Sequence, residues 1–359
     1  MASSQQSRAA VLALLLIGAG GLVAAVLLLR QRSAPQGGAP PAPQLFAPDS
    51  VWNNPLTPGA ATDPQSRGLV RKLTSEVRTE QQKGTGPYIA TGLASTPLYV
   101  AGRGQKRVPV KLGPTGTPGA AALRRALRSV PIPAGARPAA GSDAHLAIWQ
   151  PSTDTMWELF EARHQRDGWR AAWGGAMRDV SRNAGYYTPA AWPGATYEWG
   201  ATATSLPVVG GTVLGADIRS GRIDHALSLA LPAPRRRVFA WPAQRSDGTG
   251  GPAELPEGAK LRLDPRLDLA SLRLPPPTLM LAEAAQRYGL IVRDQTHHAI
   301  GLYFQDPASV GGNPYRAFFS GLTPNRVLAA FPWSHLQVLR LHLCTHAPCT
   351  THGAGKESP

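Results

Sequence analysis

The residues most suggestive of chemistry stand at the start of a predicted strand, residues 223–231. Asp224 and His225 lie at this turn-to-strand junction, where a rigid backbone can aim a side chain at a substrate. Adjacent residues of a strand point to opposite faces, so Asp224 would not orient the ring of His225. We predict His225 as a general base or a sugar ligand and Asp224 as a candidate catalytic carboxylate. The alternative is a buried histidine whose ring bonds to the backbone.

A second candidate site is the segment 241–248, which reads Trp-Pro-Ala-Gln-Arg-Ser-Asp-Gly. An indole ring such as Trp241 can cover the apolar face of a sugar, while Gln244 and Asp247 offer groups for its hydroxyls. Arg245 can bind the carboxylate of a uronic acid through two parallel hydrogen bonds. These residue types predict a carbohydrate site. The alternative is an ordinary turn at Asp247, with Trp241 in the core.

Two strands are predicted at 145–150 and 156–162, and the turn between them makes a hairpin. His145 begins the first strand and is a candidate for binding substrate. In the second strand Trp157 and Glu158 point to opposite faces. We predict Trp157 as a sugar platform and Glu158 as a catalytic carboxylate.

Glycosidases use two carboxyl groups about 5–9.5 Å apart. Glu158 would pair with Asp224 or with Asp247, and the sequence does not decide between them. Trp199 lies in a stretch rich in Trp and Tyr that would widen a sugar-binding surface. The alternatives are ordinary, because Glu158 would form an ion pair with one of the many arginines and Trp199 would pack in the core.

The chain has two cysteines, Cys344 and Cys349, close to its end. Histidines around them suit zinc or copper, but the spacing fits no standard zinc pattern. We predict a disulfide formed in an oxidising compartment, with free thiols or a metal site as alternatives. The G-x-S-x-G, H-E-x-x-H, Walker and G-x-G-x-x-G motifs do not occur, so we predict neither a cofactor nor a metal.

Strand patterns outnumber helical patterns from residue 46 onward. Strands are expected at 98–101, 108–112, 145–150, 156–162, 168–173, 223–231, 237–241, 261–263, 290–294 and 300–305. Helices are expected at 63–80, 120–129, 278–288 and 333–343. About ten strands with few helices predict a mainly β fold, a single β-sandwich or jelly-roll-like domain with peripheral helices. The helical run that flows into the strand at 290–294 suggests one α/β excursion.

An uncharged apolar run occupies residues 9–29, between Arg8 and Arg30. About 21 helical residues span roughly 30 Å, the hydrocarbon core of a bilayer, so we predict a retained transmembrane anchor rather than a cleaved signal peptide. The Pro/Gly/Ala-rich stretch that follows would hold a domain away from the membrane. The predicted plan is a cytoplasmic segment at 1–8, the anchor at 9–29, a linker at 30–45, an extracytoplasmic β-rich domain at 46–343 and a tail at 344–359.

The 359-residue chain is 43% hydrophobic, which is typical of a globular protein, and has a formal net charge of +15. Such a charge attracts anionic polymers such as polyuronates, teichoic acids or phospholipid headgroups. A coding bias toward Ala, Gly, Pro and Arg is the alternative source of the charge. The predicted location, and the lack of a basic helix or an aromatic RNA-binding strand, argue against a nucleic-acid partner. We predict a monomer.

The anchor, the β-rich domain, the Trp-rich stretches and the charge together predict a cell-surface or secreted protein that acts on polysaccharide, as a lyase or a glycosidase. In a lyase, Arg245 would neutralise a uronate carboxylate, and His225 or a tyrosine would take the proton at C5. The rival prediction is a non-catalytic envelope protein that binds an anionic polymer or a protein partner.

From Phe46 onward the chain resembles a set of secreted or membrane-anchored actinobacterial proteins. The segments that carry this resemblance include FAPDSVWN at 46–53, GRIDHALSLALP at 221–232, WPAQRSDG at 241–248, PEGAKLRLDP at 256–265 and AAQRYGLIVRD at 284–294. It covers most of residues 46–340 and implies a secreted or anchored location. It implies no particular reaction, so no catalytic residue is transferred from it.

Overall fold

The computed structural model describes residues 44–351, 353 and 354, which belong to one compact unit of the chain. The predicted segment 1–8, the predicted anchor 9–29 and nearly all of the predicted linker lie outside the described residues. In the described part, no helix is both long enough and apolar enough to cross a membrane.

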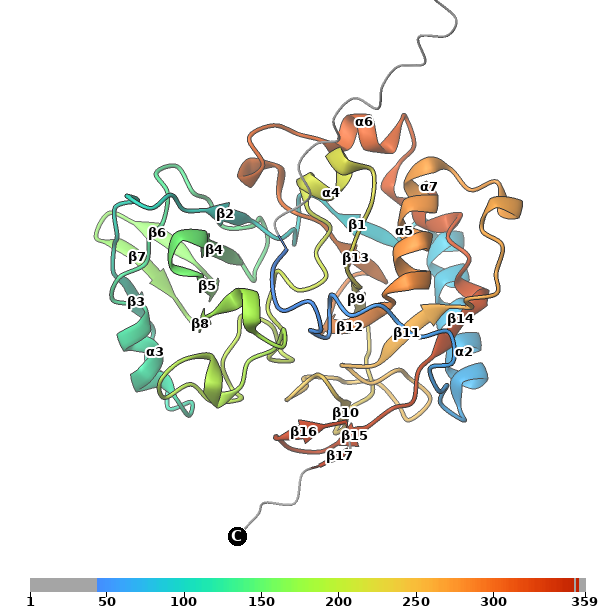
Figure 1. The fold of residues 1–359 in the computed structure, drawn as a ribbon, viewed down its shortest axis with the longest axis horizontal. Coiled ribbons are helices and arrows are strands. Elements are labelled where there is room, and N and C mark those ends of the chain that lie inside the picture. The colour runs from blue at the N-terminus through green and yellow to red at the C-terminus, as the bar shows by residue number, and fades with distance from the viewer. Residues whose placement is uncertain (1–43, 352, 355–359) are drawn as a thin grey trace, which may run out of the picture. The chain divides into compact units, whose positions relative to one another are not determined.

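A mixed six-stranded sheet is the centre of what we call the large-sheet region, the sheet together with the helices packed on it (Figure 1). The two middle strands, β9 and β12, pair in parallel and are buried almost throughout. β9 is apolar except at Ser228 and β12 begins with three apolar residues, which suits strands covered on both faces. The strand order is β1 (Tyr88–Ala90), β13 (Gly301–Tyr303), β9 (Leu227–Leu231), β12 (Leu290–Gln295), β11 (Lys260–Leu263) and β14 (Leu336–Val338).

Three helices pack on this sheet. The helix α2 (Ser66–Lys83) lies against β14, α5 (Pro276–Arg287) against β11 and β9, and α7 (Pro324–Ala329) against β1. The apolar face of α2, which includes Leu69, Leu73 and Val77, is buried as its sequence spacing predicts. The helix ends at a left-handed Gly84.

The small-sheet region consists of a four-stranded sheet, a three-stranded sheet and the helix α3 (Ala120–Ala126). The predicted hairpin at 145–162 is confirmed, because β4 and β5 pair antiparallel with Ile148 opposite Trp157. The four-stranded order is β2 (Leu98–Val100), β4 (Leu146–Gln150), β5 (Thr155–Phe160) and β8 (Trp173–Arg178), and the three-stranded order is β3 (Val110–Leu112), β7 (Gly168–Ala171) and β6 (Arg163–Gln165).

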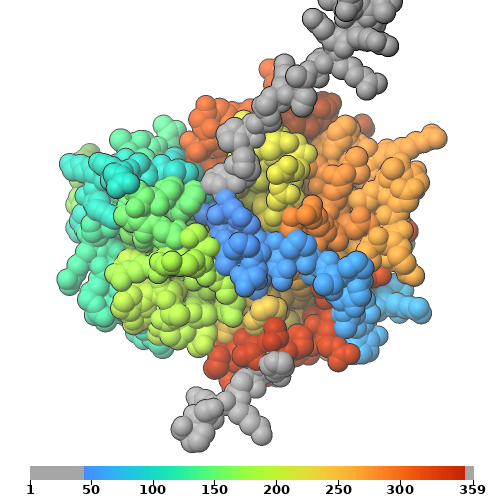
Figure 2. All heavy atoms as spheres, viewed as in Figure 1, coloured from blue at the N-terminus to red at the C-terminus, as the bar shows by residue number. Residues whose placement is uncertain are grey.

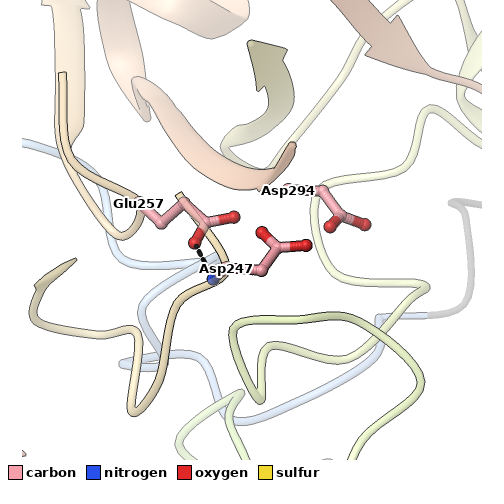
Figure 3. Close-up of side chains that lie close together, drawn as sticks. All are labelled: Asp247, Glu257 and Asp294. Atoms are coloured by element: carbon pink, nitrogen blue, oxygen red, sulfur yellow. Dashed lines mark hydrogen bonds between the residues drawn. The ribbon is translucent and has the colours of Figure 1, made fainter. Parts of the chain in front are cut away.

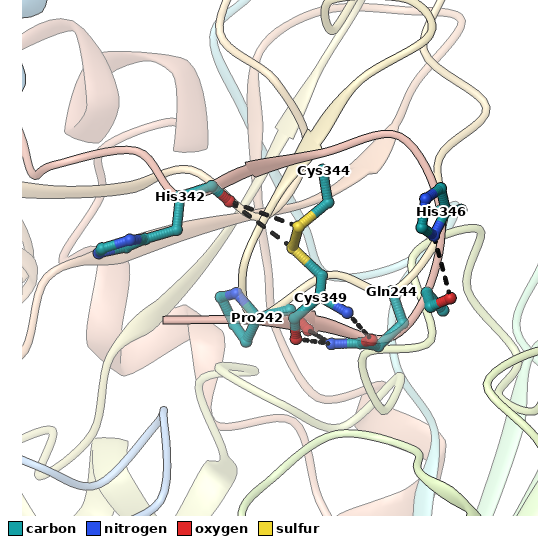
Figure 4. The surroundings of a disulfide bond; sticks show 7 residues. Pro242, Gln244, His342, Cys344, His346 and Cys349 are labelled. Atoms are coloured by element: carbon teal, nitrogen blue, oxygen red, sulfur yellow. Dashed lines mark hydrogen bonds between the residues drawn. A yellow bond between two sulfur atoms is a disulfide. The ribbon is translucent and has the colours of Figure 1, made fainter. Parts of the chain in front are cut away.

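The end of the described chain forms two short strand pairs around a disulfide (Figure 4). The strand β10 (Phe239–Ala240) pairs with β15 (Leu343–Cys344), and β16 (Cys349–Thr350) pairs with β17 (Gly353–Ala354). Cys344 and Cys349 are joined, with an S–S distance of 2.09 Å. The side-chain amide of Gln244 bonds both the carbonyl and the N–H of Cys349, at 2.9 and 2.8 Å, which holds the tail against residues 241–244.

The predicted helix at 333–343 is wrong. Only Trp333–His335 forms a helical turn, and the next residues enter β14 and β15. Leu336 and Val338 are buried while Gln337 between them is half-buried, a period of two that suits a strand paired with β11. The remaining short helices are α4 (Gly215–Ser220), α6 (Tyr315–Phe319) and the 3-10 turns Pro151–Thr153, Val180–Arg182, Pro189–Ala191, Ala270–Leu272 and Pro307–Ser309.

Mixed sheets with few helices are compatible with the mainly β fold expected from the sequence. The pairing differs from an antiparallel jelly roll, because β1 pairs with β13, β9 with β12, β2 with β4 and β3 with β7 in parallel. Parallel neighbours need crossover connections, and α5 provides one of them directly before β12. The expected α/β excursion therefore lies at the centre of the large sheet.

The first described residues cross the boundary between the two regions (Figures 1 and 2). The backbone N–H of Val51 bonds Ala184, and that of Leu56 bonds Arg287 at the end of α5. Trp52 is buried between them and donates its indole N–H to the carbonyl of Gly185 at 2.7 Å. This segment connects the small-sheet region to the large sheet.

Candidate functional site

A pocket of about 450 Å³ lies between the two regions, and we call it the central pocket. Its wall combines ends of strands from both sheets with the backbone of residues 200–203 and the loop at 139–144. The chain therefore brings together side chains that are far apart in the sequence. Those able to do chemistry include Tyr88, Asp143, His145, Arg245, Asp247, Asp294, His297, His298 and Tyr303, and Phe160 and Trp173 add aromatic surface.

A bulge in β12 directs Asp294 to this pocket. Val292 pairs with Leu229 and Asp294 pairs with the next residue of β9, Ala230, so Arg293 is the extra residue between them. Bulges redirect side chains and are common beside active sites. Asp294 lies in the pocket wall with 8% of its surface exposed.

Asp294 belongs to a cluster of three carboxylates with Asp247 and Glu257 (Figure 3). One oxygen of each lies within 4.8 Å of the others, and Asp247 stands between its two neighbours. Asp247 is exposed, whereas Glu257 is fully buried behind the wall. The Oε2 atom of Glu257 accepts the backbone N–H of Asp247 at 3.2 Å, and its Oε1 atom has no hydrogen-bond partner.

The ionisation of this cluster is strongly perturbed. Burial raises the pKa of Asp294 to about 7; the charges of Asp247 and Asp143 add to this, and Arg293 opposes it. Burial also raises the pKa of Glu257 well above its usual range, reinforced by Asp247 and Asp294. Like charges held together out of water need a proton or a cation to compensate them.

His145 is a neutral base in the wall of the pocket. Burial lowers the pKa of its ring to about 4, which outweighs the opposing effect of Asp143. The Nε2 atom lies 2.9 Å from the carbonyl oxygen of Ala201. A carbonyl only accepts hydrogen bonds, so the single proton of the neutral ring is on Nε2, and Nδ1 carries the lone pair.

Arg245 reaches the pocket from the segment 241–248. Its guanidinium donates to the carbonyl of Thr202 at 2.7 Å and to the hydroxyl of Ser205 at 3.0 Å, and it lies 3.7 Å from the carboxylate of Glu198. A quarter of the side chain is exposed. The carbonyls hold the arginine in place and leave part of it facing the pocket.

Two tyrosines complete the wall from the large sheet. Burial raises the pKa of both Tyr88 and Tyr303, so the phenols stay protonated at neutral pH and can donate a proton. The guanidinium of Arg293 lies 3.7 Å from the centre of the Tyr303 ring. Arg293 is fully buried and also donates to the carbonyl of Val208, which supports the backbone next to the pocket wall.

His225 lies in another pocket, of about 260 Å³, which we call the His225 pocket. Its Nδ1 lies 2.8 Å from the carbonyl of Ala226, and its Nε2 lies 3.2 Å from the carboxylate of Asp217. Burial lowers the pKa of His225, but the charge and the hydrogen bond of Asp217 outweigh burial, so the pKa is raised. Asp224 is paired with Arg222 at 2.6 Å. The structure therefore does not bring His225 or Asp224 together with Arg245 in one pocket.

Glu158 is buried under the wall of the central pocket. Its two oxygens accept the backbone N–H groups of Ala201 at 2.6 Å and Val208 at 2.9 Å, from both ends of one loop. Burial raises its pKa to about 7, against the effect of these hydrogen bonds. Within the described residues no arginine forms the alternative ion pair with Glu158, although the charges of Arg293 and Arg245 lower its pKa. Its contacts are those of a residue that positions the loop.

The other predicted sugar ligands lie mainly in the interior. Trp157 and Trp199 are 2% and 0% exposed, and the indole N–H of Trp157 donates to the carbonyl of Ala126. Gln244 is 2% exposed and bonds the tail. Trp241 is half-buried and packs edge-on against Tyr186. Sugar binding by these four residues stays a prediction, and the burial of Trp157, Trp199 and Gln244 does not support it.

Sequence reasoning did not identify Asp294, Glu257, Tyr88 or Tyr303 as site residues. The signal for Asp294 was present, because a charged Arg-Asp pair follows directly on the apolar run 290–292 of a predicted strand. Glu257 lies in a Pro-Glu-Gly turn before a strand, a context in which an acid is ordinarily exposed. Only the packing of the two regions shows that this turn is buried beside Asp294.

Comparisons of the chain with protein-family models, curated proteins and solved structures find no match. The resemblance to secreted and anchored actinobacterial proteins therefore stays a prediction, and the central pocket must be interpreted from its own chemistry.

Proposed function

We propose that this protein is an extracytoplasmic carbohydrate-active protein that cleaves an acidic polysaccharide by β-elimination in the central pocket. One observation carries the proposal. A histidine with a lone pair on Nδ1, protonated tyrosines and a partly exposed arginine line the same pocket. A base, an acid and a carboxylate-binding group are the parts that this reaction needs.

The proposed step balances within the pocket. Arg245 binds the carboxylate of a uronic acid and makes the neighbouring C5–H more acidic. Nδ1 of His145 accepts this proton, the electron pair forms the C4=C5 double bond, and the C4–O bond breaks. The leaving oxygen takes a proton from the hydroxyl of Tyr88, the more exposed of the two tyrosines.

The aromatic wall of the central pocket and the positive net charge of the chain suit an acidic sugar polymer. Phe160 and Trp173 offer aromatic surface for the apolar faces of sugar rings. The net charge of +15 attracts a polyanion from solution. The disulfide is typical of a protein outside the cytoplasm. Membrane attachment through residues 9–29, with the sugar-binding domain outside the cell, and a monomeric state belong to the same proposal.

Hydrolysis is the second candidate reaction. Asp247 and Asp294 both line the pocket, with one oxygen of each within 4.8 Å of the other. That is near the short separation used by retaining glycosidases, about 5–5.5 Å between carboxyl groups. In this reaction one carboxylate would attack and the other carboxyl would donate the proton.

The test is product analysis with the full chain purified in detergent micelles. We would incubate it with neutral and acidic polysaccharides and record both new reducing ends and the ultraviolet absorbance of unsaturated uronates. Reducing ends with absorbance support β-elimination, and reducing ends alone support hydrolysis. Saturable, salt-sensitive binding without product would favour a non-catalytic envelope protein that binds anionic polymer.

A matched pair of arginine variants locates the reaction. R245Q is expected to lower the cleavage rate on an acidic polymer by roughly 100-fold, because the uronate loses its charged partner. R222Q, in the exposed mouth of the His225 pocket, is the control and should cleave like wild type. Equal rates for the two variants would contradict the assignment of the central pocket.

A further inference from the structure

The carboxylate cluster has a composition that suits a hard cation. Asp247, Glu257 and Asp294 come from three separate segments, and the fold places one oxygen of each within 4.8 Å of the others (Figure 3). Ligands on separate segments are held by tertiary structure and not by local turn geometry. Oxygen is the ligand that calcium and magnesium prefer.

A second observation points to a ligand here. Glu257 is 0% exposed, and its Oε1 atom has no hydrogen-bond partner. In Figure 3 the Oε2 atom faces the backbone nitrogen of Asp247, while the free oxygen points toward the carboxylates of Asp247 and Asp294. A buried carboxyl oxygen without a partner is costly, and charging all three neighbouring carboxyl groups needs a compensating positive charge.

The basic groups near the cluster act on it from beyond ion-pair distance, and the charge of Arg293 opposes the rise in the pKa of Asp294. Within the described residues, no lysine, arginine or histidine nitrogen within 4.0 Å of these three carboxylates is recorded as an ion pair. Arg245 is paired with Glu198, and Arg293 donates to carbonyls and covers the ring of Tyr303. A cation from solution would supply the missing positive charge.

We infer that Asp247, Glu257 and Asp294 bind a divalent cation of the calcium class. Three carboxylate oxygens spaced in this way leave room for the longer bonds and irregular geometry that calcium accepts. Magnesium demands near-ideal octahedral geometry and keeps most of its water, which a site with a fully buried glutamate favours less. The absence of cysteine and histidine from the three ligands favours a hard cation over zinc or copper.

The cation also deepens the proposed function, and this part of the inference rests on it. An acidic sugar entering the central pocket meets Asp247 and Asp294, which would repel it. A bound divalent cation reverses the local sign and gives the uronate carboxylate a second positive partner beside Arg245. The substrate class is thereby narrowed to polymers whose carboxylates can reach a bound cation.

Calorimetry on the full chain in detergent micelles tests the inference. After removal of bound metal with EDTA and transfer to chelator-free buffer, CaCl2 is titrated into the protein. We expect saturable binding with a Kd on the order of 10⁻⁴–10⁻³ M, as in extracellular calcium modules. E257Q and D294N should each weaken binding at least ~10-fold, whereas E283Q, an exposed acid on α5, should bind like wild type.

Thermal unfolding gives an independent readout. CaCl2 should raise the Tm of wild type and of E283Q and should leave the Tm of E257Q unchanged, since a ligand of the native state stabilises it by mass action. If E257Q does not fold, D247N replaces it, because Asp247 is exposed and its substitution leaves the core intact. Equal responses to calcium in E283Q and the cluster variants, no response in any of them, or tighter binding of MgCl2 than of CaCl2 would overturn the inference.

The failures of the two proposals can be told apart. Calcium binding without cleavage of any polymer contradicts the proposed function and leaves the cation site standing. Cleavage that persists in EDTA, in a protein that binds no calcium, overturns the cation site and leaves the central pocket as the site of reaction.

Discussion

The central pocket and the His225 pocket each contain a histidine near acidic groups, but they differ in how completely those groups are hydrogen-bonded. In the His225 pocket both ring nitrogens have acceptors, Asp217 also accepts the backbone N–H of Leu214, and Asp224 is paired with Arg222. In the central pocket the ring of His145 keeps one lone pair, and Glu257 keeps a buried oxygen without a partner.

This difference separates a structural polar cluster from a site. Polar groups that already have hydrogen-bond partners within the protein stabilise the fold and have no free donor or acceptor for a ligand. Buried polar atoms without hydrogen-bond partners cost free energy. They are found where a substrate or an ion provides the missing partner. Residue type alone pointed to His225, whereas bonding points to His145.

The largest expected effect is that of H145Q, and H225Q is its matched comparison. H145Q keeps an N–H for the carbonyl of Ala201 but loses the basic nitrogen, so polysaccharide cleavage should fall by about 10²–10⁴-fold. H225Q should change the cleavage rate by less than about twofold, because His225 lies outside the central pocket. Initial rates of unsaturated product formation measure both.

Circular dichroism of H145Q serves as its folding control. A folded H145Q with wild-type activity would remove His145 from the mechanism, and a large loss of rate in H225Q would reverse the order of the two pockets.

The loop that forms a wall of the central pocket should be sensitive to Glu158. E158A leaves the backbone N–H groups of Ala201 and Val208 buried without an acceptor, and we expect a loss of about 3 kcal/mol in the free energy of unfolding. Urea denaturation measures this. A loss below about 1 kcal/mol would show that the loop is held by other contacts.

The same carboxyl predicts a pH dependence. Its pKa is about 7 in the folded protein and near 4.5 when unfolded, so its contribution to stability is present below pH 4.5 and is lost as the pH rises through 7. E158Q cannot titrate. Wild type should therefore lose unfolding free energy relative to E158Q as the pH rises from 5 to 8. Urea denaturation at several pH values measures this difference.

A smaller effect of the same kind is expected in the His225 pocket. Asp217 raises the pKa of His225, so this pair stabilises the protein fully below pH 6.5, and the contribution is lost as the pH rises through the folded-state pKa. D217N keeps an acceptor for Leu214 but removes the charge. We expect D217N to lose about 1–2 kcal/mol at pH 6 and clearly less at pH 9, and a pH-independent difference would contradict the ion pair.

The smallest effect should come from the exposed pair between Arg222 and Asp224. Their side chains are 63% and 48% exposed, and solvent-exposed ion pairs contribute about 0–1 kcal/mol. R222A should change the midpoint of thermal unfolding little, and high salt should remove most of that change. A change that persists in high salt would show that Arg222 packs rather than pairs.

Local patterns predicted the elements whose side chains face one core. The apolar spacing of 69–77 identified α2, and alternating residues on either side of a turn identified the hairpin of β4 and β5. The same reasoning failed at 333–343, where only pairing with β11 and β10 distinguishes two short strands from a helix. The parallel pairing of β9 with β12 was equally beyond local patterns, because sequence spacing does not encode strand order.

Arg245 and Asp247 were expected to work together, and both line the central pocket. Their partners were not predictable in the same way. Asp294 faces the pocket because of a bulge at Arg293, and the burial of Glu257 follows from the packing around its turn.

Local patterns are enough to predict the strands with a strong apolar pattern and the helix α2, because each depends on residue types a few positions apart. Composition sets the positive charge, and the short spacing of the two cysteines lets them join. Which acids lose water and which histidine keeps a free nitrogen depends on how the chain packs. Desolvation and hydrogen-bond partners depend on segments that can lie more than 200 residues away, and no local pattern carries that information.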